Sequence, residues 1–511
     1  MPQGTMESRH FPARTVVFKR ERNGVTYRIP ALLYIAHSRT LLAFAEERLS
    51  PADIDAKFLV LRSGTFYRSY VEWEDMKALQ SAHLKNHRSM NPCPVYDEFT
   101  GTVFLFFIAV LGNTSESYQL VTGKNVTRLC YITSTDQGRS WSSVTDLTET
   151  TIGSSIKGWA TFALGPGHGI QLKSGRLVIP AYTYHIDCKV CFEKKCNTTP
   201  HSFTFYSDTH GKIWKFGEFI PNLETLENQV VSVDEEDGTT LLYCNARSSL
   251  GFRVQAVSFD DGAVFETGQL VQKLVEPPHG CHGSIIGFPA PFEKNCIHPL
   301  QGNAINRETT ALTGAESFKP SAIIDSYCIN KDCQSTPFYA HLNENQMGLE
   351  GQQDISGCSD ISNLKVHNPL SDPNNCCKGA ILLSSSKFKL QTPTWMLHSH
   401  PTSPTSRINM GIYLSTFPRD PDSWTDPWVI YEGPSAYSDL ASIELHSASG
   451  DHHIPAMAFA CLYESGHKVP YEEISFSMFT LYELVRNIPY KAGLQMKMNR
   501  ANRVPLCCPI N

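Results

Sequence analysis

The chain has 511 residues, 41% of them hydrophobic and 11% aromatic, which is enough to bury a large core in one large domain or several small ones. Its formal net charge is −6 at pH 7, and the body of the chain contains no long basic block, so the charge gives no reason to expect nucleic acid as a partner. An anionic ligand would have to be bound locally, by individually placed arginines.

The sequence predicts neither a secretory signal nor a membrane-spanning helix. Residues 1–22 mix acidic and basic side chains and have no sustained apolar core. The longest apolar run, residues 103–111, is too short to cross a bilayer as a helix and predicts a strand buried on both faces. The 16 cysteines of such a chain are expected to be reduced thiols and not a disulfide framework.

From residue 14 to about residue 290 the chain consists of short apolar segments separated by turn residues, with almost no helical periodicity. Many short strands at fairly regular spacing predict an all-β sandwich, barrel or propeller. Clear examples of such segments are residues 59–62, 129–132, 176–179, 203–206 and 241–244.

Three turns decide among these all-β architectures. Residues 134–141, 207–214 and 258–265 share the pattern Ser-x-Asp-x-Gly-x-x-aromatic, except that Thr209 replaces the Asp of the second copy. Ser and Asp side chains bind turn amides, Gly adopts the left-handed conformation, and the aromatic ring can pack under the turn. Three copies in one β-rich chain predict a repeated hairpin, and hence the repeated blades of a propeller.

Residues 291–393 are polar and rich in turn residues, which predicts a long, partly disordered surface insertion. Strand patterns resume after it and are expected to close the ring. Residues 14–290 and 394–487 are therefore assigned to a six-bladed β-propeller, and residues 488–511 to a C-terminal tail. Without the insertion and tail, about 64 residues remain for each blade, which suits four strands with some long loops.

The three turns resemble the Asp-boxes of the vertebrate exo-α-sialidases (neuraminidases), and the chain is similar to that family over residues 14–290 and 395–484. The resemblance implies a retaining exo-α-sialidase that acts on gangliosides, oligosaccharides and glycoproteins without a metal or other cofactor, with the boxes away from the active site. Residues 200–203, residues 423–434 and the paired cysteines of the tail resemble one vertebrate member most, and a membrane-associated ganglioside sialidase second.

Three arginines, Arg28, Arg247 and Arg407, lie in or beside strand patterns far apart in the sequence. In a propeller, residues of different blades converge on the central axis, so three blades can direct three guanidinium groups at one point. Planar guanidinium forks suit a carboxylate. A surface position or an ion pair explains each arginine alone. The resemblance implies that they are the sialidase triad that binds the substrate carboxylate, and that Glu464 is the acid that orients Arg28.

The resemblance also implies that Tyr437 is the nucleophile and Glu227 its base, although packing or solvent exposure would explain either residue alone. Sialic acid carries a carboxylate on its anomeric carbon, and this carboxylate would repel a carboxylate nucleophile. A neutral phenol that Glu227 deprotonates during the attack avoids the repulsion.

Asp53 is the candidate general acid that protonates the leaving oxygen and later activates water. From the sequence alone Asp55 is an alternative, and the spacing from Arg48 in the family motif favours Asp53. Nearby arginines would lower the pKa of Asp53, whereas the acid role needs its protonated form, so we expect an acidic pH optimum.

Further positions resemble substrate contacts of the family, although core packing or a solvent face would explain each alone. These are Arg48 in a basic rim, Met90 and Asn91 in an N-acyl pocket, and Glu116, Tyr182 and Tyr184 as glycerol and acyl contacts. His282 stands where the family usually has Gln. An imidazole near the site would alter either the aglycone preference or the pH response, and the sequence leaves both open.

Three cysteines at irregular spacing, Cys188, Cys191 and Cys196, follow His185. A zinc site is one interpretation, but no second pair of ligands lies nearby in the sequence, so we expect a loop with free thiols.

In the C-terminal tail, basic residues precede Cys507 and Cys508. This pattern suits a peripheral membrane anchor formed by S-acylation, and a frayed tail is the alternative. We expect an intracellular protein with peripheral membrane association, at endomembranes, lysosomes, mitochondria or the plasma membrane.

A second class of function is a non-catalytic propeller that binds sialylated glycans or scaffolds proteins. The two classes differ at Tyr437. An enzyme hydrolyses a fluorogenic sialoside and loses that activity on Tyr437→Phe, whereas a binding module has no turnover to lose. The sequence leaves linkage preference and oligomeric state open.

Overall fold

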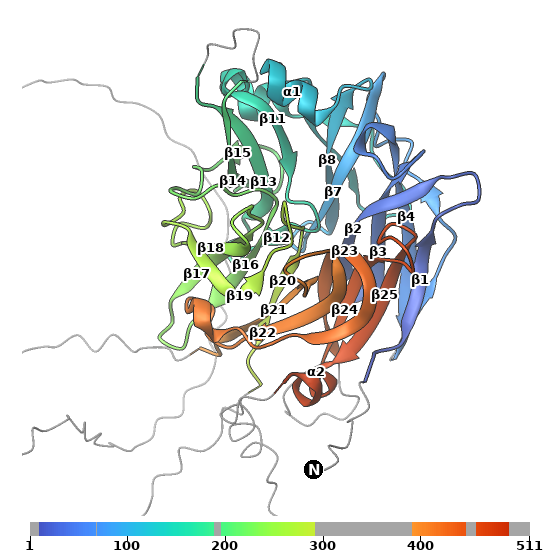
Figure 1. Cartoon of the computed structure of the whole chain (residues 1–511), viewed down its shortest axis with the longest axis vertical. Helices are drawn as coiled ribbons and strands as arrows, with labels where there is room; N and C mark the ends of the chain where they lie inside the picture. Colours follow the sequence, from blue (N-terminus) through green and yellow to red (C-terminus); the bar gives the residue numbers. More distant parts are fainter. Residues whose placement is uncertain (1–9, 68, 189–195, 292–390, 446–455, 490–511) are drawn as a thin grey trace, which may run out of the picture. The chain divides into compact units, whose positions relative to one another are not determined.

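The structure is a computed structural model, and it describes residues 10–67, 69–188, 196–291, 391–445 and 456–489 (Figure 1). These residues belong to one compact unit, formed by residues 1–296 and 387–511. Nearly all of the expected insertion, residues 291–393, and of the expected tail, residues 488–511, lies outside the described residues.

Antiparallel sheets follow one another along the chain, and the first two are built from consecutive strands. The first sheet contains β2 (Thr26–Ile35), β3 (Thr40–Arg48), β4 (Ala56–Tyr67) and β5 (Tyr70–Trp73), with β6 (Lys77–Ala78) beside β4. The second contains β7 (His87–Asp97), β8 (Thr102–Leu111), β9 (Thr127–Ser134) and β10 (Thr145–Asp146). The short helix α1 (Glu116–Thr122) connects β8 to β9.

The next two sheets repeat this order. The third contains β11 (Trp159–Leu164), β13 (Leu177–Ile186), β14 (Thr198–Ser207) and β15 (Lys215–Phe216), with β12 (Ile170–Gln171) beside β13. The fourth contains β16 (Asn228–Asp234), β17 (Thr240–Ala246), β18 (Phe252–Ser258) and β19 (Gln269–Val275). Each sheet therefore uses one local segment of the chain, as repeated blades require.

The last sheet has seven strands, because one long strand joins two parts. Its strands are β20 (Ser284–Pro289), β21 (Thr394–Pro401), β22 (Ile408–Ser415), β23 (Trp428–Leu445), β24 (Ala456–Ser465), β25 (Glu473–Thr480) and β1 (Arg14–Lys19). The first part of β23 pairs with β22, and its second part, from Ser435 on, pairs with β24. β1 pairs with β25, so an N-terminal strand completes the C-terminal sheet, and helix α2 (Leu481–Asn487) follows.

The centre of the molecule is formed by the strands β2, β7, β12, β16, β20 and β23, which all contribute to one axial cavity of about 360 Å³. Between these strands, the buried carboxylate of Asp439 accepts hydrogen bonds from Leu32 N at 2.7 Å and Ser284 Oγ at 2.7 Å, and contacts His168 Nδ1 at 2.7 Å. One carboxylate thus connects four separate segments. The prediction of an all-β chain with a propeller-like arrangement is confirmed.

The first and third repeated turns form the hydrogen bonds that their sequence predicts. In the first turn, Gly138 N donates to Ser134 Oγ at 2.8 Å, and Ser140 N donates to Asp136 Oδ1 at 2.8 Å. In the third turn, Val264 N donates to Asp260 Oδ1 at 2.9 Å.

The second turn keeps this pattern although Thr209 replaces Asp. The Thr209 hydroxyl oxygen accepts the hydrogen bond from Ile213 N at 2.8 Å, in the place of a carboxylate oxygen. The departure in sequence therefore leaves the fold of the turn unchanged.

Each of these turns packs against the sheet that precedes its own. A Cβ on Gly138 would lie 3.1 Å from Leu42 of the first sheet, and one on Gly211 would lie 2.4 Å from Phe104 of the second. The ring of Trp214 packs edge-on against Phe106, with centroids 4.7 Å apart. The turns thus fasten neighbouring sheets to each other.

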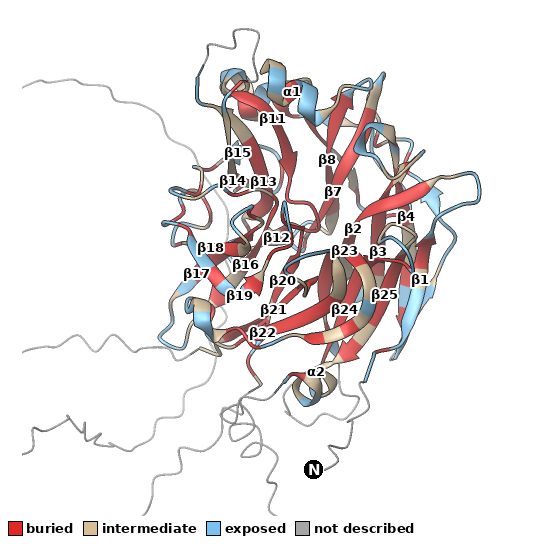
Figure 2. Ribbon diagram, viewed as in Figure 1, coloured by how far each residue is buried: buried red, intermediate tan, exposed pale blue. Residues whose placement is uncertain are grey.

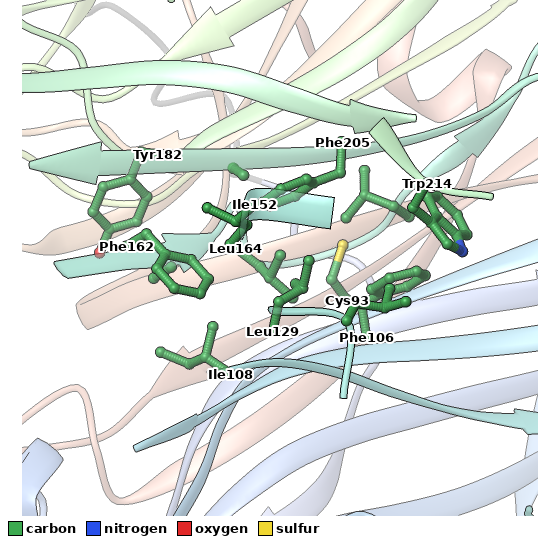
Figure 3. Close-up of a cluster of buried hydrophobic side chains, with 14 of the residues drawn as sticks. Cys93, Phe106, Ile108, Leu129, Ile152, Phe162, Leu164, Tyr182, Phe205 and Trp214 are labelled. Atoms are coloured by element: carbon green, nitrogen blue, oxygen red, sulfur yellow. The ribbon is translucent and has the colours of Figure 1, made fainter. Parts of the chain in front are cut away.

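The hydrophobic core lies between the sheets, and Figure 2 shows the burial concentrated along the strands. One cluster joins the second and third sheets through side chains such as Phe106, Leu129, Phe162 and Phe205 (Figure 3). These strands are apolar on both faces because each face contacts a neighbouring sheet. The expectation that residues 103–111 form a strand is met by β8, which is buried over most of its length.

Free cysteines of the described residues are Cys93, Cys130, Cys188, Cys244, Cys281 and Cys461. Cys196 is disulfide-bonded, so the prediction of a loop with only free thiols is wrong for this residue. Within the described ranges, no cluster of His, Cys, Asp and Glu is suited to hold a metal ion. No helix in the same ranges has the length and apolarity to span a membrane.

Candidate active site

A cavity of about 250 Å³ opens where the central strands begin. It receives side chains from the start of β2, from β7, from the ends of β3, β8 and β13, and from the region of Tyr437 in β23. β9 runs antiparallel from the cavity end of β8, so the repeated turn after β9 lies at the opposite end of the sheet. The cavity is therefore separated from the turns that hold the sheets together.

Every residue expected to touch substrate or to do chemistry lines this cavity. They are Arg28, Arg48, Asp53, Met90, Asn91, Glu116, Tyr182, Tyr184, Glu227, Arg247, Arg407 and Tyr437. Glu464 was expected only to support Arg28, and it lies behind the wall of the cavity, fully buried. The structure thus brings together side chains that are up to about 400 residues apart in the sequence.

Irregularities in the strands direct several of these side chains. The pairing of β2 shifts register between Arg28 and Ala31, where Ile29 has a φ of 58°. β7 shifts after Met90, where Asn91 has a φ of 55°. β-Bulges re-aim side chains and are frequent at active sites. The cavity residues of β2 and β7 therefore depend on local breaks in the strand pattern.

The same device occurs at the other side of the cavity. β22 shifts register between Ile408 and Met410, next to Arg407, and Asn409 there has a φ of 60°. β23 shifts between Ser435 and Ser438, the interval that contains Tyr437. In a strand with regular alternation, the side chains of Arg407 and Tyr437 would have other directions, because a bulge changes where the neighbouring side chains point.

Arg28 is held by Glu464 at the cavity floor. Arg28 Nε donates to Glu464 Oε1 at 2.9 Å, and Nη2 donates to Oε2 at 3.4 Å. Glu464 also accepts hydrogen bonds from Ile29 N at 3.0 Å and Tyr437 N at 3.2 Å. Burial acts to lower the pKa of Arg28, but the charge and hydrogen bonds of Glu464, together with Tyr471 and Tyr437, outweigh this effect and raise the pKa. One buried carboxylate therefore fixes both Arg28 and the backbone of Tyr437.

Tyr437 lies at the centre of a hydrogen-bonded group. Its hydroxyl donates to Glu227 Oε1 at 2.5 Å and accepts from Arg247 Nη1 at 2.9 Å. Arg247 Nη1 also donates to Glu227 Oε2 at 2.7 Å. The guanidinium carbons of Arg28 and Arg407 each lie 5.6 Å from the centroid of the phenol ring. Burial and the charge of Glu227 hold the pKa of Tyr437 well above its ordinary value, against the effect of Arg247. The phenol is therefore neutral at rest.

Arg407 is held by a backbone carbonyl. Its Nη2 donates to the carbonyl oxygen of Gly280 at 2.9 Å. Among the described residues no acidic group forms an ion pair with it, although Arg28 and Arg247 each have one. Arg407 can therefore bind an anion that enters the cavity.

Asp53 is carried by the 3-10 turn Asp53–Asp55, which follows β3. Its carboxylate accepts a hydrogen bond from Arg48 Nη1 and lies 4.0 Å from Arg28 Nη1. Desolvation acts to raise the pKa of Asp53, but Arg48 and Arg28 outweigh it and lower the pKa. Asp55 does not line the cavity and accepts a hydrogen bond from Ser50 Oγ at 2.6 Å. The structure thus places Asp53, and not Asp55, at the site.

Arg48 differs from the expected rim residue, because its side chain is 1% exposed. Arg48 Nη2 lies 2.6 Å from Glu46 Oε2, and Glu46 Oε1 accepts a hydrogen bond from Asn91 N at 2.6 Å. Glu46 was not among the predicted residues, since a glutamate beside another in a strand gives no signal of burial. Glu46 therefore connects Arg48 to Asn91, which belongs to the expected N-acyl pocket.

The sequence also gave no indication of four polar residues that line the cavity. They are Arg88, Gln119, Thr127 and Thr161. Gln119 Oε1 accepts hydrogen bonds from Val126 N at 2.8 Å and Thr127 Oγ1 at 3.2 Å. Helix periodicity over seven residues of α1 is too short a signal to have shown that Gln119 faces inward.

Glu116 begins α1, and its side chain lies inside the cavity, among other cavity side chains. Desolvation, together with the charges of Asp53 and Glu227, raises the pKa of Glu116 to about 7. Tyr182 and Tyr184 both line the cavity from one face of β13, with ring centroids 6.2 Å apart, as their spacing predicts (Tyr182 is labelled in Figure 3).

His282 is fully buried and does not line the cavity. Its ring lies behind Tyr437, with centroids 5.4 Å apart. Burial lowers the pKa of His282 well below its ordinary value, so the ring is neutral. The two effects expected of this imidazole, on aglycone preference or on pH response, stay predictions.

Comparison with known proteins identifies the family. A family model described as a BNR repeat-like domain matches residues 39–280. Sialidase-4 of Mus musculus is 48% identical over 503 residues, which cover 98% of each chain. Sialidase-3 of Homo sapiens is 40% identical and covers 92% of this chain and 93% of that protein.

Among solved structures, a Hadza microbial sialidase has a TM-score of 0.57 at 18% identity, over 90% of this chain and 67% of that chain. At this identity the likeness concerns the fold alone, and it agrees with the propeller-like arrangement of the sheets. The extent and identity of the curated relatives carry the assignment: the chain belongs to the sialidase family of glycoside hydrolases.

Proposed function

We propose that the chain is a retaining exo-α-sialidase in which Tyr437 is the nucleophile, Glu227 its base and Asp53 the general acid. One observation carries the proposal. The Tyr437 hydroxyl lies 2.5 Å from Glu227 Oε1, inside a cavity that also contains Arg28, Arg247 and Arg407. A nucleophile in hydrogen-bond contact with a base is the geometry that covalent catalysis requires.

The three arginines bind the carboxylate on the anomeric carbon of sialic acid. Charge-assisted bonds from planar guanidinium groups fix both the position and the orientation of a carboxylate. Bound in this way, the anomeric carbon faces Tyr437, whose neutral hydroxyl approaches it without charge repulsion.

In the first step, Tyr437 Oη bonds to the anomeric carbon while its proton moves to Glu227 Oε1. The bond from that carbon to the leaving oxygen breaks, and Asp53 gives a proton to this oxygen. In the second step, Asp53 takes a proton from water and the water oxygen bonds to the anomeric carbon. The bond from that carbon to Tyr437 Oη breaks, and this oxygen regains its proton from Glu227. Two displacements at one carbon retain its configuration.

The low pKa of Asp53 sets the pH dependence. Because Arg48 and Arg28 lower this pKa, the protonated fraction of Asp53 in the free enzyme falls as the pH rises above the acid range. We expect an acidic optimum, and an activity that stayed constant from about pH 4 to pH 8 would contradict the role of Asp53.

The proposed fold has six blades. This count rests on β23, whose two halves pair with different strands, and on the six strands that line the axial cavity. In this arrangement β20–β22 with the first half of β23 form one blade, and the second half of β23 with β24, β25 and β1 forms the last.

The substrates proposed are gangliosides, oligosaccharides and glycoproteins with a terminal sialic acid. Met90, Asn91, Glu116, Tyr182 and Tyr184 would contact the N-acyl and glycerol groups of the sugar. Peripheral attachment of an intracellular protein to a membrane, through Cys507 and Cys508, remains part of the proposal, and both cysteines lie outside the described residues.

Hydrolysis of a fluorogenic sialoside tests the function. We expect turnover by the native chain and a loss of at least about 10³-fold in kcat on Tyr437→Phe, because the phenyl ring has no nucleophilic oxygen. Tyr243→Phe is the matched control, since it removes a buried hydroxyl that donates to Gln255 Oε1 at 3.0 Å in β17 and β18.

Covalent trapping tests the nucleophile itself. With 2,3-difluorosialic acid, the peptide that contains Tyr437 should gain the mass of one difluorosialyl group. A native chain without turnover would favour the non-catalytic propeller, and a label on any other residue would overturn the role of Tyr437.

A further inference from the structure

The loop between β19 and β20 directs its carbonyl oxygens at two arginines of the cavity (Figure 1 labels both strands). Arg247 donates to the carbonyl oxygen of His279 from Nε at 2.9 Å and from Nη2 at 2.6 Å. Arg407 Nη2 donates to the next carbonyl, that of Gly280, at 2.9 Å. Two successive peptide groups therefore set the orientation of two guanidinium groups.

These bonds determine which nitrogen of Arg247 contacts Tyr437 and Glu227. With Nε and Nη2 occupied by His279, Nη1 is the group that reaches Tyr437 Oη at 2.9 Å and Glu227 Oε2 at 2.7 Å. A rotation of the guanidinium plane would break all of these contacts together. The position of the His279 carbonyl is thus coupled to the hydrogen bonds of Tyr437.

A buried ion pair between Arg253 and Glu276 holds the same loop, residues 279–281, by its backbone. Arg253 Nη1 lies 3.0 Å from Glu276 Oε1, and both side chains are fully buried. Glu276 Oε2 accepts from Cys281 N at 2.8 Å, and Arg253 Nη1 donates to Cys281 O at 2.8 Å. The pair therefore holds both backbone groups of the residue that follows Gly280. Arg253 is in turn held by Asn245 Oδ1 at 2.7 Å, two residues before Arg247.

The backbone of the loop needs such support. His279 and Gly280 both have left-handed conformations, with φ of 64° and 67°. A Cβ on Gly280 would lie 2.7 Å from Ser248 O and 2.8 Å from Arg247 Cγ. A left-handed non-glycine residue costs free energy and persists where its surroundings hold it.

Stability alone does not account for the pair. A buried ion pair contributes little net stability compared with well-packed apolar side chains, because desolvation offsets its attraction. Here, however, both charged groups also bind the backbone of the loop that orients Arg247 and Arg407. A pair of apolar side chains could fill the same space but could not hold Cys281 by its N–H and C=O.

We propose that Glu276 and Arg253 are positioning residues, which hold the 279–281 loop so that its carbonyls orient Arg247 and Arg407 for the substrate carboxylate. The proposal rests on the function proposed above, since it assigns these arginines to carboxylate binding. Neither positioning residue lines the cavity.

Glu276→Gln tests the pair while keeping the size of the side chain. We expect KM for a fluorogenic sialoside to rise at least about 10-fold, since displacement of binding groups by about 1 Å has effects of this size or larger. A purely structural role would lower the amount of folded enzyme, and hence the apparent kcat, without changing KM. Rates are therefore divided by the folded fraction measured from thermal unfolding.

Gly280→Ala tests the loop without touching the pair, because the new Cβ pushes against Arg247. We expect KM to rise at least about 10-fold here also. Gly153→Ala is the control, since Gly153 likewise has a positive φ, of 56°, and its Cβ would meet nothing within 4 Å. This control carries backbone strain but leaves the arginines alone, so its KM should equal that of the native chain.

The outcomes separate the two proposals. A native chain without turnover overturns the proposed function itself. A native chain with turnover, and an unchanged KM in either Glu276→Gln or Gly280→Ala, overturns the positioning proposal alone. If Glu276→Gln does not fold, Arg253→Lys decides, because it keeps the charge but loses the bonds that the guanidinium group forms, including the one to Cys281 O. KM should again rise at least about 10-fold, and an unchanged KM overturns the proposal.

Discussion

At the scale of single residues, the side chains around Tyr437 place one phenol between an acceptor and several cations. Glu227 accepts its hydrogen bond, Arg247 donates to its oxygen, and Arg28 and Arg407 flank its ring. Because the pKa of the phenol is high, the proposed attack requires its proton to leave as the new bond forms. The cations would then stabilise the negative charge that develops on the oxygen.

Glu116 adds a charge to this cavity that depends on pH. Since its pKa is raised to about 7, the carboxyl is neutral below pH 7 and carries a negative charge above it. A negative charge beside the arginines weakens the binding of an anionic sugar. We therefore expect KM for a sialoside to rise between about pH 6 and pH 8.

Glu116→Gln checks this prediction, because the amide is neutral at every pH. The rise in KM over this interval should disappear in the variant, while the fall in kcat that depends on Asp53 should remain. The same KM profile in the variant and the native chain would show that another group titrates.

At the scale of elements, the repeated turns act as fasteners between sheets. Each has its glycine or its aromatic ring against the preceding sheet, and each lies at the end of the sheet opposite the cavity. Their side-chain hydrogen bonds should therefore contribute to stability and not to substrate binding.

Asp136→Ala and Thr209→Ala compare two copies of the turn. Asp136 accepts from Ser134 Oγ, Ser140 N and Ser140 Oγ, whereas Thr209 accepts one short bond, from Ile213 N. We expect Asp136→Ala to lower the free energy of unfolding by about 1–2 kcal/mol and Thr209→Ala by about 0.5–1 kcal/mol.

Chemical denaturation measures both losses, and KM for a sialoside should stay at the native value in both variants. A change in KM without a loss of stability would contradict this expectation, because it would mean that the turns affect substrate binding from the opposite end of the sheet.

At the scale of the whole molecule, the first and the last described strands pair in one sheet. β1 pairs with β25, from Arg14 opposite Ser477 to Lys19 opposite Glu473. Phe18 of β1 is 2% exposed and packs against Tyr27, with ring centroids 5.8 Å apart. The strand thus connects the last sheet to the first and closes the ring.

Phe18→Ala tests this closure. Removing a buried phenyl ring leaves a cavity in the core, so we expect the free energy of unfolding to fall by about 3–5 kcal/mol. Phe11→Ala is the matched control, because Phe11 is 42% exposed and should change stability by no more than about 0.5 kcal/mol. Equal losses in urea denaturation would mean that β1 does not close the ring.

Local information in the sequence was sufficient to predict the fold class and the hydrogen bonds of two of the three turns. Short apolar segments between turn residues, and the three repeated turns, predicted an all-β, propeller-like chain, because strand and turn preferences depend on near neighbours. The first and third turns predicted their own hydrogen bonds, and the structure adds that Thr209 forms the equivalent bond in the second turn. The resemblance to sialidases then supplied the set of cavity residues.

Tertiary structure decided what depends on distant contacts. The sequence alone left Asp53 and Asp55 as alternatives, and burial of Arg48 against Glu46 had no local sign. Arg253 and Glu276 carried no motif, yet together they hold the loop beneath Arg247. Arg28, Arg247, Arg407 and Tyr437 meet only when separate sheets close into a ring, because only closure brings the ends of strands from different sheets to one cavity.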